Sequence, residues 1–313
     1  MTIWGVNALN HGHSIAVFSG HELSMLTSGS GDELDKSSIF AAFNYGGPSE
    51  VYWYERPLIK KFRQLRAGQY STAFDMSVMP RRYLDSINLK YAKLKYTPHH
   101  ASHAAAGYYT SPFNHCAIVV LDAIGEFECA TIWEGKHGEI KKVWSRSYPN
   151  SLGLFYSAFT QLIGYKPLLE EHLLQRDSEL GDPKKYYGTV KSYFDGVVGL
   201  KYNLHRGVLD WPWPIVDQQD KYNIAAAVQQ VFEEQVDMVM LIARRLTGSK
   251  SLVYMGGCAM NSKYNKQLPK QWDYIWSLPN PGDASSAVGA VLYHSQQRIN
   301  YKFGVAKHID IIV

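Results

Sequence analysis

Three histidines lie within five residues at the start of an alanine-rich segment: His99, His100 and His103. On a helix, His99 and His103 lie four positions apart on one face, so one metal ion can take a nitrogen from each. Asp122 follows a strand-like apolar run, and Asp283 ends the tight-turn sequence Pro-Asn-Pro-Gly-Asp. Two imidazoles and two carboxylates suit iron or manganese better than a structural zinc with thiolates. We predict that His99, His103, Asp122 and Asp283 bind one metal ion in a cleft between the two halves of the chain.

His100 belongs to the same segment but is turned about 100° away from His99 on a helix. We place it behind the two ligands or facing an acceptor molecule. The alternative for the whole group is a helix start with solvated histidines, and finding three histidines within five residues weakens that alternative.

Histidine also occurs in an N-terminal turn, where His11 and His13 flank Gly12. A histidine on a glycine-containing turn at a strand end can transfer a proton or contact phosphate. Taken alone, the pattern is that of an ordinary surface turn. The functional interpretation gains weight because the corresponding turn of the second half carries Gly125 and Glu126. We therefore treat the two turns as facing one cleft.

A third turn contains Gly256 and Gly257, between a strand-like segment and Asn261 in the first turn of a predicted helix. Glycines let the backbone approach a ligand, and a helix N-terminus favours anions. The arrangement indicates contact with adenosine or phosphate.

The elements that position these residues follow a repeated pattern, in which three short strands precede helices in each half of the chain. The strands are expected at 3–8, 14–18 and 22–28, and again at 116–121, 127–134 and 139–146. We predict a duplicated α/β architecture. Its parts are a first lobe at 1–115, a second lobe at 116–300, an insertion at about 166–220 that covers the cleft, and a tail at 301–313.

The composition places the protein in a broad class. The 313 residues are 46% hydrophobic and 19% charged, which suits a globular protein with a substantial core. We find neither a membrane-spanning apolar run nor a signal peptide, and the three cysteines show no metal or disulfide spacing. We therefore expect a cytoplasmic protein with free thiols and no membrane partner. The net charge of +4 permits a polyanionic partner without requiring one.

Basic residues and aromatics alternate around Lys60, Lys61 and Arg63. Such a stretch suits a nucleic-acid surface. The alternative is the solvated basic face of an amphipathic helix, which we favour slightly from the pattern alone.

Several motifs, in order along the chain, make it resemble the carbamoyltransferases of the nodulation, cephamycin and tobramycin type, specifically their N-terminal catalytic domain. The opening strand and turn match as Gly5 to Ser14, with one extra residue and with His13 where an acidic residue is usual. The other matching segments are Tyr54 to Leu58, His99 to Ala105, Asp122 to Glu126, Ser151 to Tyr156, Gly256 to Asn261 and Pro279 to Ser285. They span nearly the whole chain.

The resemblance implies the duplicated actin/sugar-kinase/heat-shock-ATPase-like (ASKHA) fold, with two lobes around a nucleotide cleft. It implies transfer of a carbamoyl group from carbamoyladenylate, made from carbamoyl phosphate and ATP, to an acceptor hydroxyl. It also implies Fe(II) at the four-residue site, with manganese or zinc as alternatives, and proton transfer by His11 with His13 beside it. The nucleotide-binding residues would be Gly125, Glu126, Ser151, Gly153, Gly256, Gly257, Asn261 and Gly282.

The chain departs from the family in two respects. The K-x-M-G-L-A segment that normally follows the Gly164 to Lys166 region is missing. The family's YrdC-like domain, which makes carbamoyladenylate, is not found in the sequence. We expect a separate YrdC-like protein to supply the donor.

The acceptor is the least determined part of the hypothesis. A compact chain rich in Tyr and Lys suggests a hydroxymethylpyrimidine such as 5-hydroxymethylcytosine in phage-type DNA. The acceptor contacts would come from His100, Lys60, Lys61, Arg63, Trp211 and Trp213. One alternative acceptor is a sugar or antibiotic hydroxyl. An alternative of another class is a non-catalytic, nucleotide-binding regulatory subunit, against which the metal residues and His11 argue.

Overall fold

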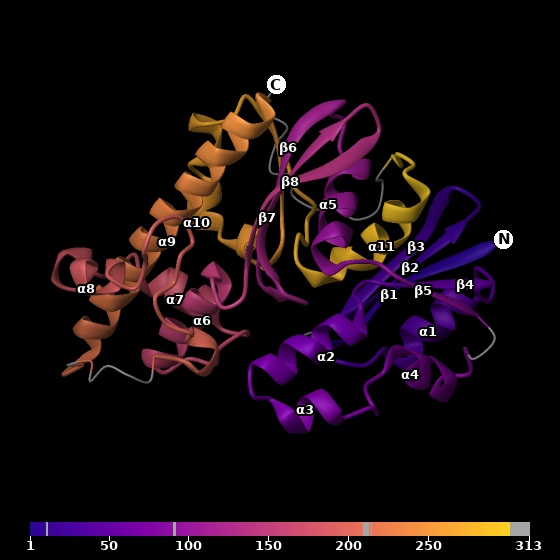
Figure 1. Cartoon of the computed structure of the whole chain (residues 1–313), viewed down its shortest axis with the longest axis horizontal. Helices are drawn as coiled ribbons and strands as arrows, with labels where there is room; N and C mark the ends of the chain where they lie inside the picture. Colours follow the sequence, from indigo (N-terminus) through magenta and orange to yellow (C-terminus); the bar gives the residue numbers. More distant parts are fainter. Residues whose placement is uncertain (11, 90–91, 209–212, 214, 301–313) are drawn as a thin grey trace.

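The computed structural model describes residues 1–300 apart from 11, 90–91, 209–212 and 214 (Figure 1). The first sheet contains β1 (Thr2–Asn10), β2 (Gly12–Ser19), β3 (Glu22–Gly29), β4 (Glu50–Trp53) and β5 (Lys93–Tyr96). Its spatial order is β3-β2-β1-β4-β5. The first three strands pair in antiparallel fashion, whereas β4 and β5 continue the sheet in parallel with β1.

The second sheet contains β6 (His115–Gly125), β7 (Glu128–Lys136), β8 (Glu139–Ser147), β9 (Ser251–Met255) and β10 (Tyr274–Trp276). Read from β8, its order is β8-β7-β6-β9-β10, the same as in the first sheet, with the same parallel and antiparallel pairs. This repetition confirms the duplicated α/β fold. The central strand β6 is fully buried from Cys116 to Leu121, as expected of a strand covered on both faces.

Helices lie between and around the sheets. Those that precede the second sheet are α1 (Lys36–Phe43), α2 (Pro57–Arg66), α3 (Tyr70–Phe74), α4 (Pro80–Ser86) and α5 (His99–Thr110). Those that follow β8 are α6 (Leu152–Leu162), α7 (Glu171–Asp177), α8 (Tyr187–Lys191), α9 (Gln218–Thr247), α10 (Ser262–Asn265) and α11 (Ser286–Ser295). The long helix α9 begins with a side-chain cap from Asp217 and ends at the left-handed Gly248.

Helices α5 and α11 pack against each other between the two sheets (Figure 1). Helix α5 follows the first sheet in sequence but packs on the second sheet, whereas α11 follows the second sheet and packs on β1. Gly289 of α11 permits the close crossing, because a Cβ there would lie 1.7 Å from the carbonyl oxygen of Ser102. The two halves are therefore joined through these helices.

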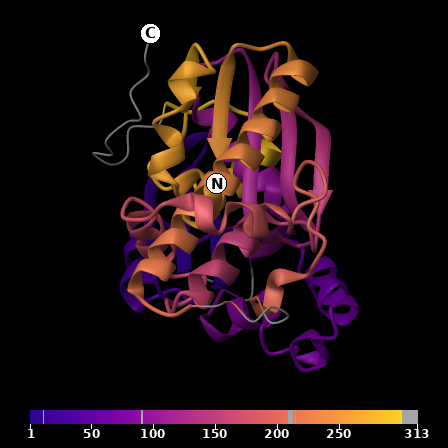
Figure 2. The same ribbon diagram turned by 90° about the vertical axis from the view of Figure 1, so that its left-hand side faces the viewer.

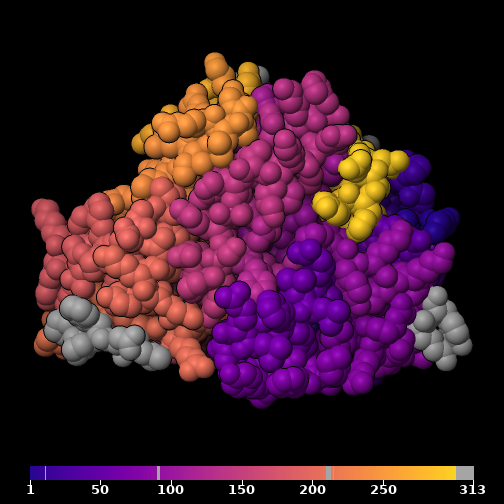
Figure 3. Space-filling view, viewed as in Figure 1, coloured from indigo at the N-terminus to yellow at the C-terminus, as the bar shows by residue number. Residues whose placement is uncertain are grey.

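Two hydrophobic cores fill the molecule. One joins the first sheet to α5 and α11, and the other lies between the outer face of the second sheet and α6 and α9 (Figure 2). In the predicted insertion at 166–220, α7 and α8 pack on α9. In the space-filling view, residues before about 110 form the right and lower part of the molecule, against the second half (Figure 3). No described helix has the length and apolar character needed to span a bilayer.

Candidate metal centre and central cavity

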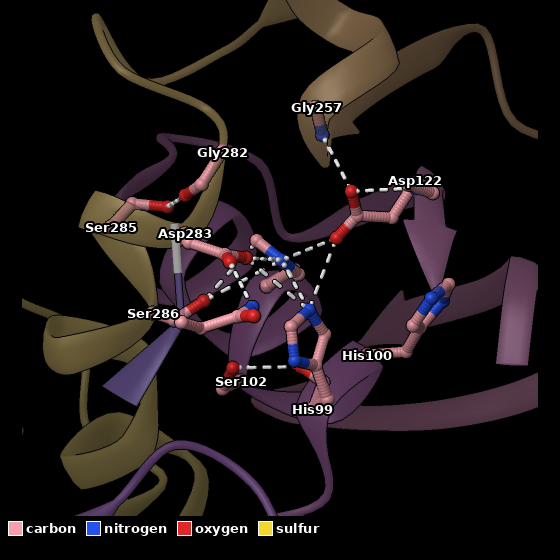
Figure 4. Close-up of polar contacts among 12 residues, drawn as sticks. His99, His100, Ser102, Asp122, Gly257, Gly282, Asp283, Ser285 and Ser286 are labelled. Atoms are coloured by element: carbon pink, nitrogen blue, oxygen red, sulfur yellow. Dashed lines mark hydrogen bonds and ion pairs between the residues drawn. The ribbon is translucent and has the colours of Figure 1, made fainter. Parts of the chain in front are cut away.

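The four predicted metal ligands converge on one point (Figure 4). His99 Nε2 lies 3.0 Å from Asp122 Oδ2 and 3.3 Å from Asp283 Oδ1. His103 Nε2 lies 3.2 Å from Asp122 Oδ2 and 3.3 Å from Asp283 Oδ1. The two Nε2 atoms are 3.1 Å apart. The sequence prediction that these four residues come together is therefore supported by their placement.

The local structure explains why the imidazoles face the carboxylates. Helix α5 begins at His99, so His103 lies one turn further on the same face. Both imidazoles are buried between the sheets. Gly125 at the end of β6 makes room for them, since a Cβ there would lie 2.5 Å from the ring of His99.

Each carboxylate uses one oxygen for support and presents the other to the imidazoles. Asp122 Oδ1 accepts hydrogen bonds from the N–H of Ala123 at 2.8 Å and of Gly257 at 3.4 Å. Asp283 Oδ2 accepts one from the side chain of Asn10 at 3.2 Å. Asp283 Oδ1 is buried and has no hydrogen-bond partner among the described residues. That oxygen therefore needs a partner, either an N–H of one of the imidazoles or a metal ion.

The electrostatics of the group agree with this requirement. Burial opposes a charged imidazole at His99 and His103, but the charges and hydrogen bonds of Asp122 and Asp283 outweigh it and raise both pKa values. Burial likewise opposes the charged carboxylates, yet the two imidazoles hold the pKa values of Asp122 and Asp283 below their usual range. The cluster thus binds positive charge strongly.

The donor set fits a divalent metal ion. An ion about 2.0–2.2 Å from each nitrogen and oxygen donor separates neighbouring donors by roughly 3–3.5 Å, and the distances given above lie in that range. Two nitrogen and two oxygen donors without thiolate suit a borderline or harder ion. The group can therefore hold a metal, and its residues leave the choice of metal open.

The metal centre borders a cavity of about 670 Å³ between the two halves, which we call the central cavity. Asp122 and Asp283 line it, together with Asn10. The first half contributes residues of α2 and α3, and the second half contributes residues around β6, α6, α7 and the turn after β9. The volume lies in the range of small-molecule and cofactor sites.

His100 points away from the metal centre (Figure 4). It is buried, and its Nδ1 lies 2.9 Å from the hydroxyl of Thr131 on β7. Burial and the neighbouring His99 lower its pKa well below the usual value. His100 does not line the central cavity, so its position corresponds to the expected place behind the ligands and not to contact with an acceptor.

Of the two predicted catalytic histidines, His11 lies outside the described residues. His13 belongs to β2 and is buried, with Nδ1 2.8 Å from the carbonyl oxygen of Gly31 and Nε2 2.8 Å from Asp35 Oδ2. Both ring nitrogens are engaged, and His13 does not line the central cavity. Its position argues against a catalytic role and for structural support of the first sheet.

The predicted nucleotide residues divide into two groups. Those that line the central cavity are Glu126, Gly153, Gly257, Asn261 and Gly282. The others act behind the lining: Ser151 caps α6, Gly125 packs on the histidines, and a Cβ at Gly256 would lie 2.3 Å from the carbonyl oxygen of Leu121. At Gly256, the close approach of the backbone is therefore to Leu121, inside the protein.

Glu126 and Asn261 are already engaged by other side chains. Glu126 Oε1 accepts from the backbone N–H of Arg56 at 2.6 Å, and its carboxylate also pairs with the guanidinium. This ion pair joins the two halves beside the cavity. Asn261 caps α10 and exchanges hydrogen bonds with Gln229.

The predicted acceptor-binding cations do not form a free basic surface. Lys60 pairs with Glu55 at 2.9 Å, and Lys61 donates to the carbonyl oxygens of Thr72 and Asp75. Arg63 is buried and lines the central cavity. This arrangement matches neither a nucleic-acid surface nor a uniformly solvated helix face.

Trp213 lies in the second core, with its ring centroid 5.4 Å from that of Phe159 and 5.8 Å from that of Tyr186. It does not line the central cavity, which argues against stacking on an acceptor there. Trp211 lies outside the described residues. Buried aromatics and stacking aromatics have the same sequence signature, so the pattern alone could not separate them.

Sequence reasoning missed Asn10 and Arg56 as site residues. Asn10 stands directly before the predicted His11, so the same turn motif could have pointed to it. Arg56 belongs to a recognised segment, but its partner Glu126 is 70 positions away, and no local signal indicates that contact. The cavity lining from α7, including His172 and Gln175, carries no sequence signal that we identified.

Comparisons with known proteins give the family. Residues 58–292 match the model described as the carbamoyltransferase N-terminus. The chain is 31% identical over 222 residues to the uncharacterized protein sll1178 of Synechocystis, covering 64% of this chain and 36% of that protein. It is 25% identical to the nodulation protein NolNO of Sinorhizobium fredii, covering 66% of this chain and 32% of that protein. The chain therefore spans about a third of the length of these two relatives.

Solved structures with a similar arrangement include a putative N-acetylmannosamine kinase from Listeria monocytogenes, at 10% identity and a TM-score of 0.46 over 95% of this chain and 99% of that one. Another is HypF of T. kodakarensis, at 10% identity and a TM-score of 0.48 over 100% of this chain and 49% of that one. We take nothing about function from them. The match of the N-terminal model over most of the chain shows that the protein belongs to the carbamoyltransferase family.

Proposed function

We propose that the protein is an O-carbamoyltransferase, which moves a carbamoyl group from carbamoyladenylate to an acceptor hydroxyl. The observation that carries the proposal is the group of His99, His103, Asp122 and Asp283 at the wall of a 670 Å³ cavity, in a member of the carbamoyltransferase family. A non-catalytic nucleotide-binding subunit has no need for such a group.

The proposed reaction forms one carbon–oxygen bond and breaks another. The acceptor oxygen forms a bond to the carbamoyl carbon, the bond from that carbon to the phosphate oxygen breaks, and AMP leaves with the electron pair. The hydroxyl proton passes to a base. A bound metal, which we propose to be Fe(II), supplies Lewis-acid polarisation of the carbonyl or phosphate oxygen.

The chain's own residues position the reactants. Asn10 fixes the orientation of Asp283, and the backbone N–H groups of Ala123 and Gly257 fix that of Asp122. The Arg56–Glu126 pair links the two halves beside the cavity. His11 remains our proposal for the base that takes the hydroxyl proton.

The acceptor is the finer part of the proposal. A hydroxymethylpyrimidine in DNA is the acceptor predicted from sequence, with Lys60, Lys61 and Arg63 among its expected contacts. All three are engaged or buried, as described above. The volume of the central cavity, about 670 Å³, suits a small-molecule ligand and supports the alternative, a sugar or other small-molecule hydroxyl, which we therefore place first. The donor would be supplied by a YrdC-like protein.

The test is a reconstituted reaction. The protein, a YrdC-like enzyme, ATP and carbamoyl phosphate are incubated with amino-sugars in one arm and with hydroxymethylcytosine-containing DNA in another. We expect mass spectrometry to find carbamoylated sugar, and the Asp283→Asn variant to lose product formation. Carbamoylated DNA without carbamoylated sugar would restore the DNA acceptor. Equal product from the parent and from Asp283→Asn would overturn the role of the metal centre.

A further inference from the structure

Arg63 is a buried cation that has no counter-ion among the described residues. It lies on α2, its side chain is 6% exposed, and it lines the central cavity. Its Nε and Nη1 atoms are buried without a hydrogen-bond partner, and no carboxylate of the described residues pairs with it. An arginine in that state is costly, because an unpaired charge loses its hydration without compensation.

The other charges of the cavity are accounted for. Lys60, the second cation among the described lining residues, pairs with Glu55. Glu126 is paired with Arg56, and Glu171 accepts hydrogen bonds from Ser157 and from the backbone of Leu168. Asp122 and Asp283 belong to the metal centre. Arg63 is thus the cation of the described lining that no acidic group neutralises.

The surroundings of Arg63 fix its place without neutralising it. Its guanidinium carbon lies 5.7 Å from the ring centroid of Tyr148 in the second half, and the Tyr148 hydroxyl accepts a hydrogen bond from Asn203. Burial lowers the pKa of Arg63, yet an arginine stays charged at neutral pH. The neighbouring Gln64 also has an unpartnered side-chain oxygen at the cavity.

We propose that Arg63 is the anchor for an oxyanionic group of the ligand, of the phosphoryl class, in the central cavity. Guanidinium groups are the preferred protein partners of phosphate, and their interaction strengthens in a low-dielectric site. The need for an anion rests on Arg63 itself. The phosphoryl class rests on the proposed function, whose donor carries one phosphate.

The proposal differs from the sequence prediction for the same residue. A basic helix face that binds DNA would hold its cations in solvent and use them together. Arg63 is instead buried in the lining of the central cavity, one turn before Arg66, which is exposed on the same helix. The two arginines therefore form a matched pair that differs in burial, and Arg66 offers the control.

The experiment compares Arg63→Met with Arg66→Met, both in the full chain and with chelator present so that phosphate cannot bind through a metal ion. Thermal unfolding is followed with increasing inorganic phosphate, since a ligand that binds the folded state raises the melting temperature. We expect phosphate to stabilise the parent and Arg66→Met equally. Arg63→Met should weaken phosphate binding at least tenfold.

The stability of the unliganded variants separates a ligand anchor from a structural residue. Removing an unpaired buried charge should leave the melting temperature of Arg63→Met unchanged or higher, and Arg63→Lys should recover part of the phosphate response. A fall in unliganded stability or a failure to fold would overturn the proposal in favour of a packing role. Phosphate binding by Arg63→Met equal to that by Arg66→Met would also overturn it.

Binding of two further ligands, AMP and glucose 6-phosphate, shows whether the donor or the acceptor carries the phosphoryl group. If AMP loses affinity in Arg63→Met, the anchor serves the donor. If glucose 6-phosphate loses affinity and AMP does not, it serves an acceptor that carries a phosphate. Because each readout is binding, absence of carbamoyl transfer would refute the proposed function without affecting this result.

Discussion

The two sheets of the molecule share one topology but contribute different chemistry to the site. In both, the pairing of the first two strands becomes irregular near the cavity, between Asn7 and Asn10 in the first sheet and between Leu121 and Gly125 in the second. The first irregularity places the amide of Asn10 at the metal centre, and the second places the carboxylate of Asp122 there. A duplicated scaffold therefore supports an asymmetric site.

The exchange of helices explains where the site lies. Because α5 packs on the second sheet and α11 on the first, their crossing is the point where both halves meet. The imidazoles of α5 and Asp283, just before α11, lie at this crossing. The two halves therefore share the packing of these helices, whereas the candidate metal ligands come from α5 and the second half. Variants at the helix contacts, the carboxylate, the amide and the ion pairs can test this division of roles.

The helix–sheet contacts at Gly5 and at Gly107 should differ in how much an added methyl group destabilises the protein. A Cβ at Gly5 of β1 would lie 1.8 Å from the carbonyl oxygen of Ala287 in α11, which is backbone. A Cβ at Gly107 of α5 would lie 2.4 Å from Val253 and 2.7 Å from Met255, both side chains. We expect Gly5→Ala to lower the free energy of unfolding by more than about 4 kcal/mol and Gly107→Ala by about 1–3 kcal/mol.

Chemical denaturation of both variants measures this difference. Gly188→Ala is the control, because a Cβ there meets no atom within 4 Å. It should leave stability nearly unchanged. If Gly107→Ala proves as damaging as Gly5→Ala, the two helix–sheet contacts are equally rigid and the distinction between backbone and side-chain obstacles is wrong.

Removal of the carboxylate contributed by the second sheet should abolish metal binding. Asp122→Asn replaces an anionic ligand by a neutral one and leaves two buried imidazoles with one carboxylate. We expect metal affinity to fall by more than about 100-fold. That value is the upper end for substitutions of residues that only hydrogen-bond to a metal ligand. Elemental analysis of protein purified without chelator measures it. Metal content equal to that of the parent would remove Asp122 from the ligand set.

Removal of the amide contributed by the first sheet should have a smaller effect. Asn10→Ala deletes the 3.2 Å hydrogen bond to Asp283 Oδ2 but leaves all four ligands in place. We expect metal affinity to fall by about 10- to 100-fold, as for other residues that orient ligands. A competitive chelator titration of Asn10→Ala beside Asp122→Asn gives the ratio. An equal loss in both variants would contradict the asymmetry of the two sheets.

The sequence was sufficient for features that depend on local spacing or on long motifs. The first three strands of each half, the histidine helix, and the convergence of His99, His103, Asp122 and Asp283 were predicted from patterns, whereas β4 was not. What it could not show were contacts between distant segments. The burial of Arg63 and the partial burial of Trp213 depend on what packs against them, because the same residues on a free helix or loop would be solvated. The contact between His13 and Asp35 could not be foreseen for the same reason, since the two residues lie 22 positions apart.

The smallest expected difference is in stability, between an ion pair that joins the two halves and one that lies within a half. Arg56 of the first half binds the buried Glu126 of the second half, whereas Lys142 pairs with Glu128 inside the second sheet. Arg56→Met leaves a buried carboxylate with only the backbone N–H of residue 56, and we expect a loss of about 1–3 kcal/mol. Because the Lys142 ammonium is well exposed, Lys142→Met should cost less than about 1 kcal/mol.

Urea unfolding at low and high salt tests both values. High salt should reduce the contribution of the Lys142–Glu128 pair more than that of the pair with Glu126, because a buried carboxylate is less accessible to counter-ions. Arg56→Met should also make the central cavity more accessible to solvent, seen as faster amide exchange in residues 151–157 at the start of α6. Unchanged exchange there, together with a loss below 1 kcal/mol, would mean that α5 and α11 alone hold the halves together.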